Sequence, residues 1–371
     1  MKIAILTQPL RSNYGGIMQA YALQKVLSDF GHDVVTIDRQ YDRKKRIARL
    51  RDLLKPIIHV ITGRVARRRL SHREQEYVSS NIKLFIERHV ARSECINTEA
   101  QLAAHFESIY YDKVVVGSDQ VWRPCYSPNI YNYFVDFLET ELPVISYAAS
   151  FGVDHWEYSE RQTQKCRSLV AKFAAISVRE ESAVSLCKDN LGVKAVVVLD
   201  PTLLLSRENY ESLLEVQDTP GRGKGVFLYI LDPTAEKNEI VSSVSSSLGL
   251  ETFECGPQHL VDTRSRYQPD KYPSVERWIG SFRDADFVVT DSFHGCVFSL
   301  IFRKPFVVVA NHDRGAARFN SLLKLFNLTS RLVDIDTNLN NVIIEDINWG
   351  DVELRWAELR EHSLRYIADN I

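Results

Sequence analysis

The chain has 371 residues, of which 45% are hydrophobic and 25% charged, and its formal net charge is -2. This composition is that of a globular protein with a buried core, and the length favours two domains. The near-zero charge argues against nucleic-acid binding over the whole surface. The six cysteines stand singly, without zinc-site spacing, so we expect reduced thiols.

The first forty residues have the pattern of a β-α-β unit. Its strand, glycine-containing turn, helix and second strand are predicted at Lys2–Thr7, Asn13–Gly16, Met18–Phe30 and Asp33–Asp38. The opening apolar run is too short for a signal peptide, and no run reaches the roughly 18 apolar residues that span a membrane. We therefore expect a cytoplasmic protein.

Four further apolar runs, each followed by a polar turn, continue this first domain. They are Val114–Val116, Val144–Tyr147, Ala174–Val178 and Ala195–Leu199. Near-continuous runs of β-branched residues are typical of parallel strands buried on both faces. The pattern predicts an N-terminal Rossmann-like domain over residues 1–216.

A stretch of turn-forming and charged residues at 217–225 predicts a linker to a second Rossmann-like domain at 224–345. Its strands and helices are expected at Val226–Leu231, Glu236–Leu248, Phe287–Thr290, Gly295–Phe302 and Phe306–Ala310. The tail at 350–371 has helical composition, and we expect it to pack across the domain junction. The fold class is thus α/β, with two Rossmann-like domains facing each other across a cleft.

The segment 39–73 is strongly basic. It holds thirteen Lys or Arg and two Asp, a local excess of 13 − 2 = 11 positive charges. One interpretation is an insertion that makes peripheral contact with an anionic membrane surface or a phosphorylated lipid carrier. The other is a solvated helical insertion with no partner.

The segment Thr290-Asp291-Ser292-Phe293-His294-Gly295 separates a buried strand from a helix in the second domain. In open α/β sheets ligands bind beyond the carboxyl ends of the strands, where helix N-termini present N–H groups. With the hydroxyl of Ser292 and the imidazole of His294, this turn suits a phosphate. The alternative is an ordinary helix cap by Asp291 or Ser292.

Two similar corners occur in the first domain. Arg179 follows a predicted strand and can bind a carboxylate or phosphate through two hydrogen bonds, or form a salt bridge to Glu180 or Glu181. Asp119 follows Gly117-Ser118 after another strand, which suits a general base for a sugar hydroxyl or, alternatively, an Asx turn.

Two more segments lie beyond predicted strands. Asn13-Tyr14-Gly15-Gly16 forms the first strand-to-helix turn, but it is neither GxGxxG nor a P-loop, which argues against a classical nucleotide site. Arg314 and Arg318 follow the strand at Phe306–Ala310 and offer cations to the same cleft, unless they are surface charges.

Taken together, these segments resemble the polysaccharide pyruvyltransferase family. The matches recur in order between about residues 3 and 318, and no one of them would be sufficient. The matching pieces are Asn13–Gly16 with Gln19–Leu23, Val116–Trp122, Ser177–Glu180, Leu199–Thr202, Val289–Gly295 and Lys304-Pro305.

The resemblance implies a fold similar to GT-B glycosyltransferases, and phosphoenolpyruvate as the donor of a ketal-linked pyruvate. The acceptor is a sugar of a surface polysaccharide or of its lipid-linked precursor. The donor-binding Arg and His of the family match Arg179 and His294. Some members carry Arg two positions before that His, where this chain has Ser292. One clamp on the donor is therefore either absent or supplied from elsewhere, with Arg314 and Arg318 as the candidates.

On this basis His294 is assigned to the donor phosphate and to the acid step, and Asp119 to the base step. The other residues expected at the donor are Arg179, Ser292, Gly295, Arg314 and Arg318. Those expected at the acceptor, beside Asp119, are Asn13, Gly15, Gly16 and Ser118. No cofactor is expected, and no metal, since arginines and N–H groups can neutralise the donor.

Two other functions fit the same sequence. A nucleotide-sugar glycosyltransferase of polysaccharide synthesis would have the same two-domain architecture, because a fold does not fix a function. A non-catalytic assembly protein would keep the fold and use the basic segment 39–73 to dock a membrane complex.

Overall fold

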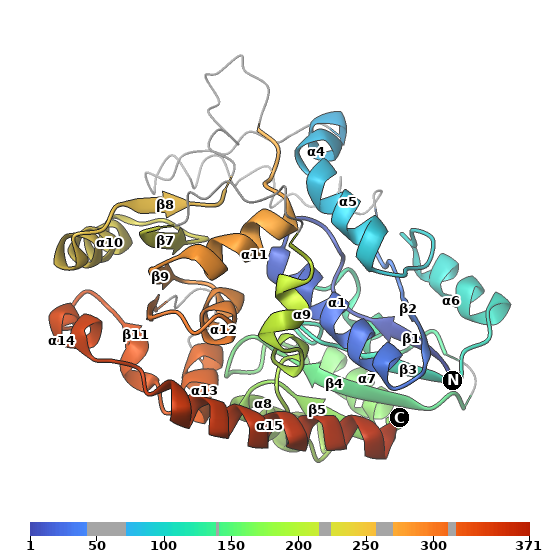
Figure 1. Cartoon of the computed structure of the whole chain (residues 1–371). Helices are drawn as coiled ribbons and strands as arrows, with labels where there is room; N and C mark the ends of the chain where they lie inside the picture. Colours follow the sequence, from blue (N-terminus) through green and yellow to red (C-terminus); the bar gives the residue numbers. More distant parts are fainter. Residues whose placement is uncertain (43–71, 139–140, 215–223, 257–269, 311–316) are drawn as a thin grey trace.

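The computed structural model describes residues 1–42, 72–138, 141–214, 224–256, 270–310 and 317–371. Two parallel sheets, one from each half of the chain, lie side by side (Figure 1). The N-terminal sheet has the order β2-β1-β3-β4-β5-β6. In chain order its strands are β1 Lys2–Leu6, β2 Asp33–Thr36, β3 Lys113–Val116, β4 Val144–Ala149, β5 Ala175–Val178 and β6 Val196–Val197.

Both faces of this sheet are buried, as the apolar runs predict. Ile3 and Ile5 of β1 point into one hydrophobic cluster, whereas Ala4 and Leu6 point into another on the opposite face. This alternation follows from the two-residue period of a strand. The helical segments of this half are α1 Tyr14–Asp29, α4 His72–Val78, α5 Ser80–His89, α6 Glu99–Ser108, η1 Ile130–Phe134, α7 Glu160–Val170, α8 Glu181–Leu186, η2 Cys187–Leu191, η3 Pro201–Leu204 and α9 Arg207–Glu211.

The C-terminal sheet has the order β11-β10-β9-β7-β8. Its strands are β7 Val226–Tyr229, β8 Thr252–Glu254, β9 Phe287–Thr290, β10 Phe306–Val309 and β11 Leu332–Val333. The helical segments are α10 Ala235–Leu248, α11 Val275–Asp284, α12 Phe293–Ile301, α13 Ala317–Leu325, η5 Thr329–Arg331, α14 Leu339–Ile344 and α15 Trp349–Asn370. The prediction of an α/β fold with two such sheets is confirmed.

Two helices begin earlier than the sequence predicts. Helix α1 starts at Tyr14, so Gly15 and Gly16 lie in its first turn, and α12 starts at Phe293 rather than Gly295. The strand-turn-helix pattern placed these residues in turns. At Gly15 and Gly295 other atoms occupy the space that a side chain would need, so only glycine fits there.

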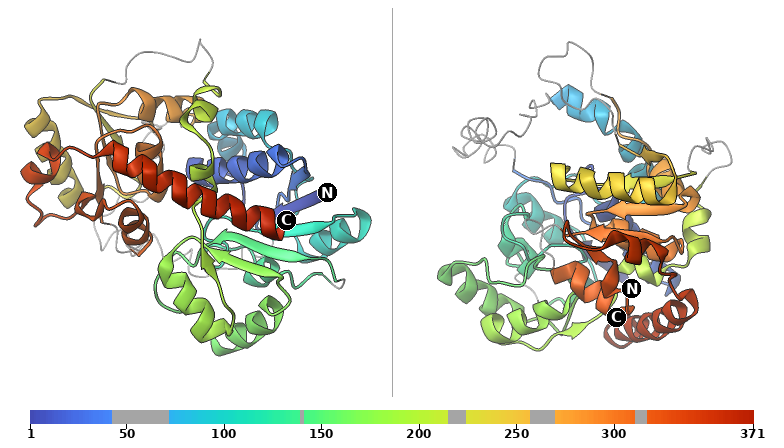
Figure 2. Two further views of the ribbon diagram at one scale, coloured as in Figure 1. Left: turned by 60° about the horizontal axis from the view of Figure 1, so that its bottom comes forward. Right: turned by 90° about the vertical axis from the view of Figure 1, so that its left-hand side faces the viewer.

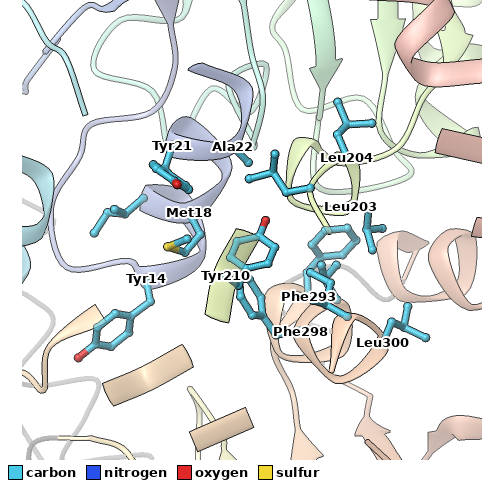
Figure 3. Close-up of a cluster of buried hydrophobic side chains, with 14 of the residues drawn as sticks. Tyr14, Met18, Tyr21, Ala22, Leu203, Leu204, Tyr210, Phe293, Phe298 and Leu300 are labelled. Atoms are coloured by element: carbon cyan, nitrogen blue, oxygen red, sulfur yellow. The ribbon is translucent and has the colours of Figure 1, made fainter. Parts of the chain in front are cut away.

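The two halves share one hydrophobic cluster rather than touching only at a linker. It joins α1, η3 and α9 of the first half to α11 and α12 of the second. Figure 3 shows Tyr210 of α9 between Met18 of α1 and Phe298 of α12. The Tyr210 and Phe298 rings pack edge to face with their centroids 5.0 Å apart. The predicted linker at 217–225 lies, up to residue 223, outside the described residues.

Helix α15 follows the second domain and returns to the first, with its end near the N-terminus (Figure 2). The indole N–H of Trp356 donates to the Leu203 carbonyl at 2.6 Å, and the Ser363 hydroxyl accepts from the Leu199 N–H at 2.9 Å. Tyr366 donates to the Ser146 carbonyl at 3.0 Å. The helix therefore holds the segment that follows β6 in place.

The basic segment is described only at its ends, because residues 43–71 lie outside the described part. Arg39 is buried, and its guanidinium donates to the Asn132 side chain at 3.0 Å and to the Asn97 carbonyl at 2.8 Å. This arginine therefore belongs to the fold of the first domain. Among the described helices none is long and apolar enough to cross a bilayer.

Candidate active site

A cavity of about 520 Å³ lies between the two sheets. Its walls come from the turns that follow β1 and β3, and from the C-terminal half. The first half contributes Ser12, Asn13, Tyr14, Asp119 and Gln120. The second half contributes Leu228, Tyr229, Ile230, Leu231, Pro233, Asn238, Val241, Glu254, Cys255, Gly256, Tyr272, Asp291, Ser292, Phe293, His294 and Arg318. A volume of this size is typical of small-molecule sites.

Helix α12 is held in place by Asp291, whose side chain is buried. Its carboxylate accepts from the backbone N–H groups of Leu231 and Asp232, at 2.6 and 3.1 Å, and pairs with Lys237 at 2.6 Å. Ser292 stands at the N-cap position, but its side chain makes no capping hydrogen bond. The carboxylate of this turn is therefore structural, while the Ser292 hydroxyl and the helix N-terminus lie at the cavity.

His294 lies in the first turn of α12 and contacts the start of α1. A Cβ on Gly15 would lie 2.1 Å from His294 Nδ1, so the imidazole occupies the space that only glycine leaves open. Gly16 lies beside Asp119 in the same way, since a Cβ added to Gly16 would lie 3.4 Å from Asp119 Oδ2. The N-termini of two helices from the two halves thus converge on one cavity wall.

Behind this wall lies a buried cluster of charges. Arg179, at the end of β5, pairs with Asp200 Oδ2 at 2.8 Å and with Asp119 Oδ1 at 3.5 Å. Its Nε atom is 3.9 Å from Glu180 Oε2. Burial lowers the pKa of Arg179, but the charges of Asp200, Asp119 and Glu180 outweigh it and raise the pKa above its ordinary value. The local salt bridge to Glu180 is therefore only one part of a larger network.

Asp200 follows β6, and its side chain is completely buried. Its Oδ1 atom accepts from the backbone N–H and the hydroxyl of Thr202, at 3.1 and 2.6 Å, and its Oδ2 atom lies 3.7 Å from His294 Nε2. Burial raises the pKa of Asp200, but His294 and Arg179 outweigh burial and hold the pKa well below its usual range. The carboxylate is therefore charged at neutral pH.

The aromatic ring of Phe293 lies near two guanidinium groups. The Arg179 guanidinium lies 4.3 Å and that of Arg318 lies 5.8 Å from the centre of its ring. Burial, with the nearby positive charge of Arg179, lowers the pKa of Arg318 to about 10. Arg318 lines the cavity, whereas Arg179 is not among the lining residues.

These features together can bind a small anion and move protons. The cavity presents a guanidinium, an imidazole, a carboxylate and a helix N-terminus at one wall.

The model of the family described as polysaccharide pyruvyl transferase matches residues 13–313. The chain belongs to this family. No protein of curated function matches the sequence.

Solved structures similar to this pyruvyl transferase family member include sugar-nucleotide enzymes. MnaA of S. aureus, in a co-structure with UDP, has 13% identity and a TM-score of 0.53, with 100% of this chain and 97% of that chain covered. A UDP-GlcNAc 2-epimerase of Neisseria meningitidis bound to UDP-GlcNAc has 10% identity and a TM-score of 0.52, with 100% and 99% covered. At these identities the likeness is one of fold, which is of the GT-B type.

The structure brings most of the predicted site residues together. Asn13, Asp119, Ser292, His294 and Arg318 line the cavity, and Arg179 lies directly behind it. The others are Gly15, Gly16, Ser118 and Gly295, which are buried and do not line it, and Arg314, which lies outside the described residues. Gly295 packs against Thr290, whose Oγ1 atom would lie 2.1 Å from an added Cβ.

Sequence reasoning gave no role to two residues of the site. Asp200 was part of a matching motif, and its position beyond a strand was the available signal. Phe293 carried no signal, since aromatic residues in such turns are usually core.

Among the described residues, no group of three or more His, Cys, Asp or Glu is arranged to hold a metal ion. Metal independence stays a prediction.

Proposed function

We propose that this family member transfers pyruvate from phosphoenolpyruvate to a sugar of a surface polysaccharide or its lipid-linked precursor, forming a cyclic ketal. The observation that carries the proposal is the convergence of Arg318, His294 and the α12 N-terminus on one wall of the cavity. Phosphoenolpyruvate has a phosphate and a carboxylate, and both groups require such partners when they leave water.

Arg318 takes the place of the cation that some family members carry at the position of Ser292. It lines the cavity, and its guanidinium and that of Arg179 contact the same ring, so the two positive charges lie close together. Burial and the charge of Arg179 lower the pKa of Arg318 to about 10, so its guanidinium is still charged at neutral pH. This charge would attract a donor anion in the cavity.

The chemistry then follows from the donor. His294 donates a proton to the methylene carbon, which becomes a methyl group and leaves a positive centre at the neighbouring carbon. One sugar hydroxyl adds there and loses its proton to Asp119, and the carbon–oxygen bond to phosphate breaks. A second hydroxyl attacks the same carbon and closes the ketal, and its proton goes to the His294 imidazole, which restores the acid. The phosphate leaves beside the α12 N-terminus and takes up the proton held by Asp119.

The acceptor enters the rest of the cavity. Asp119 lines this space, and its carboxylate is held by Arg179 at 3.5 Å. Asn13 lines the same side, and its side chain makes no capping bond to α1, so its amide can bind a sugar hydroxyl. The peripheral membrane contact proposed for 39–73 would bring a lipid-linked acceptor close, although 43–71 lie outside the described residues.

The donor class is tested by isothermal titration of the full chain with phosphoenolpyruvate, UDP-sugars and GDP-sugars. We expect saturable binding of phosphoenolpyruvate, weakened at least about tenfold in His294→Gln because the phosphate loses a charged partner. The matched control is His155→Gln, which changes an exposed histidine far from the cavity lining. Binding of a nucleotide sugar alone would instead support a glycosyltransferase.

A further inference from the structure

Asp200 has no part in the reaction as proposed, yet it contacts both donor-side groups. We infer that Asp200 is a positioning residue that holds the Arg179 guanidinium and the His294 imidazole together across the junction of the two domains. The inference rests on the proposed function for its catalytic consequence, whereas the contact itself is a property of the fold.

The geometry assigns one carboxylate oxygen to both partners. Asp200 Oδ2 lies 2.8 Å from Arg179 Nη1 and 3.7 Å from His294 Nε2. Arg179 directly follows β5 of the N-terminal sheet, and His294 lies in the first turn of α12 in the other half. All three side chains are buried. The alignment of the imidazole relative to the guanidinium therefore depends on this carboxylate.

The carboxylate is itself fixed from several directions. Thr202 donates to its other oxygen through both its backbone N–H and its hydroxyl, and Ser118 donates to Oδ2 at 3.4 Å. The preceding residue, Leu199, is bonded to Ser363 of α15. Because Asp200 is fixed by these bonds, it restricts the movement of the side chains that it contacts. Outer-shell groups orient functional side chains in this way.

Asp200 also belongs to the charge cluster around Arg179. The carboxylates of Asp200, Asp119 and Glu180 lie 2.8, 3.5 and 3.9 Å from the Arg179 guanidinium. Asp291, on the same turn as His294, is paired with Lys237 instead. Asp200 therefore connects this cluster to the imidazole of His294, which lies 3.7 Å from its carboxylate.

The catalytic consequence is tested by a double-mutant cycle on kcat/KM for phosphoenolpyruvate. We expect Asp200→Asn to lower kcat/KM about 10- to 100-fold. In the double variant with His294→Gln, the factor by which kcat/KM falls should be at least about fivefold smaller than the product of the two single factors, because the two residues act together. If kcat/KM of the double variant falls by the full product of the two single factors, the inference is overturned, since residues that act independently give such a product.

Asp38→Asn is the matched control. Asp38 is also a buried carboxylate at the edge of the N-terminal sheet, and it pairs with Arg92 at 3.0 Å, but it does not line the cavity. We expect its cost in stability to resemble that of Asp200→Asn, with kcat/KM changed less than about threefold and no coupling to His294→Gln. Equal kinetic losses in the two Asp variants would contradict a positioning role.

A second cycle needs no substrate, so it separates this inference from the proposed function. Coupling between Asp200→Asn and His294→Gln is measured in urea unfolding at neutral pH. Two residues in contact lose less stability together than the sum of their single losses. Additive losses of stability would overturn the inference. Thr202→Val, which removes the hydroxyl that donates to Asp200, replaces Asp200→Asn in both cycles if that variant does not fold.

Discussion

Two guanidinium groups lie near the Phe293 ring, that of Arg179 at 4.3 Å and that of Arg318 at 5.8 Å from its centre. Arg179 has three carboxylates around it, and Arg318 lines the cavity with its pKa lowered to about 10 by burial and by Arg179. At neutral pH both guanidinium groups remain charged. Under the proposed function, the donor anion binds at Arg318.

We therefore predict that Arg318→Gln weakens phosphoenolpyruvate binding about 10- to 100-fold, the cost of a lost hydrogen bond to a charged group. Titration calorimetry measures the change. Arg331→Gln is the control, because Arg331 is a buried arginine of the same domain that donates to the Val342 carbonyl at 2.6 Å and does not line the cavity. It should lower the Tm and leave the donor Kd unchanged. Unaltered binding in Arg318→Gln would move the missing cation elsewhere, with Arg314 the next candidate.

Whether a contact of the candidate site could be predicted from the sequence depends on which elements carry its two residues. The convergence of His294, Asp119 and Arg318 was expected, because residues beyond the carboxyl ends of parallel strands meet at one edge. The role of Asp200 was not, since its two partners come from separate halves of the chain and their approach depends on how the halves pack. No periodicity or spacing in one sequence records that packing.

At the scale of elements, the first turns of α1 and α12 are in contact, because Gly15 of α1 leaves room for the imidazole of His294 in α12. The sequence predicted both helices but placed their starts two to four residues late, at Met18 and Gly295 instead of Tyr14 and Phe293. The pattern of the sequence marks the first glycines as a turn, and it carries no record of the close contact between Gly15 and His294. The short strands β8 and β11 were not predicted either, since two or three residues carry too weak a period.

This contact predicts that Gly15→Ala is damaging. The added Cβ would lie 2.1 Å from His294 Nδ1, so the imidazole or the helix must shift. We expect kcat/KM to fall at least about tenfold, because small displacements of an acid or base are costly in catalysis. Gly280→Ala is the matched control in α11, where nothing lies within 4 Å of the added Cβ. It should raise stability by up to about 1 kcal/mol. Equal behaviour of the two variants in kinetics and thermal unfolding would refute the contact.

At the scale of the whole molecule, two parallel sheets and a returning helix form one body with a shared core. The α/β class and its pair of sheets followed from the apolar runs. The shared cluster did not, because Met18, Tyr210 and Phe298 look like ordinary core residues of separate elements. Since α15 bonds to residues on both sides of Asp200, this C-terminal helix contributes to the same junction.

The central claim concerns the donor, and product analysis tests it most directly. The full chain is incubated with ¹³C-labelled phosphoenolpyruvate, UDP-sugars and a panel of lipid-linked sugars, and the products are analysed by mass spectrometry with phosphate release in parallel. The account predicts an acceptor that gains one labelled pyruvyl group, with one phosphate released for each transfer and a rate that is on the order of 100-fold lower in His294→Gln. An acceptor that gains a sugar while phosphoenolpyruvate stays intact would contradict it.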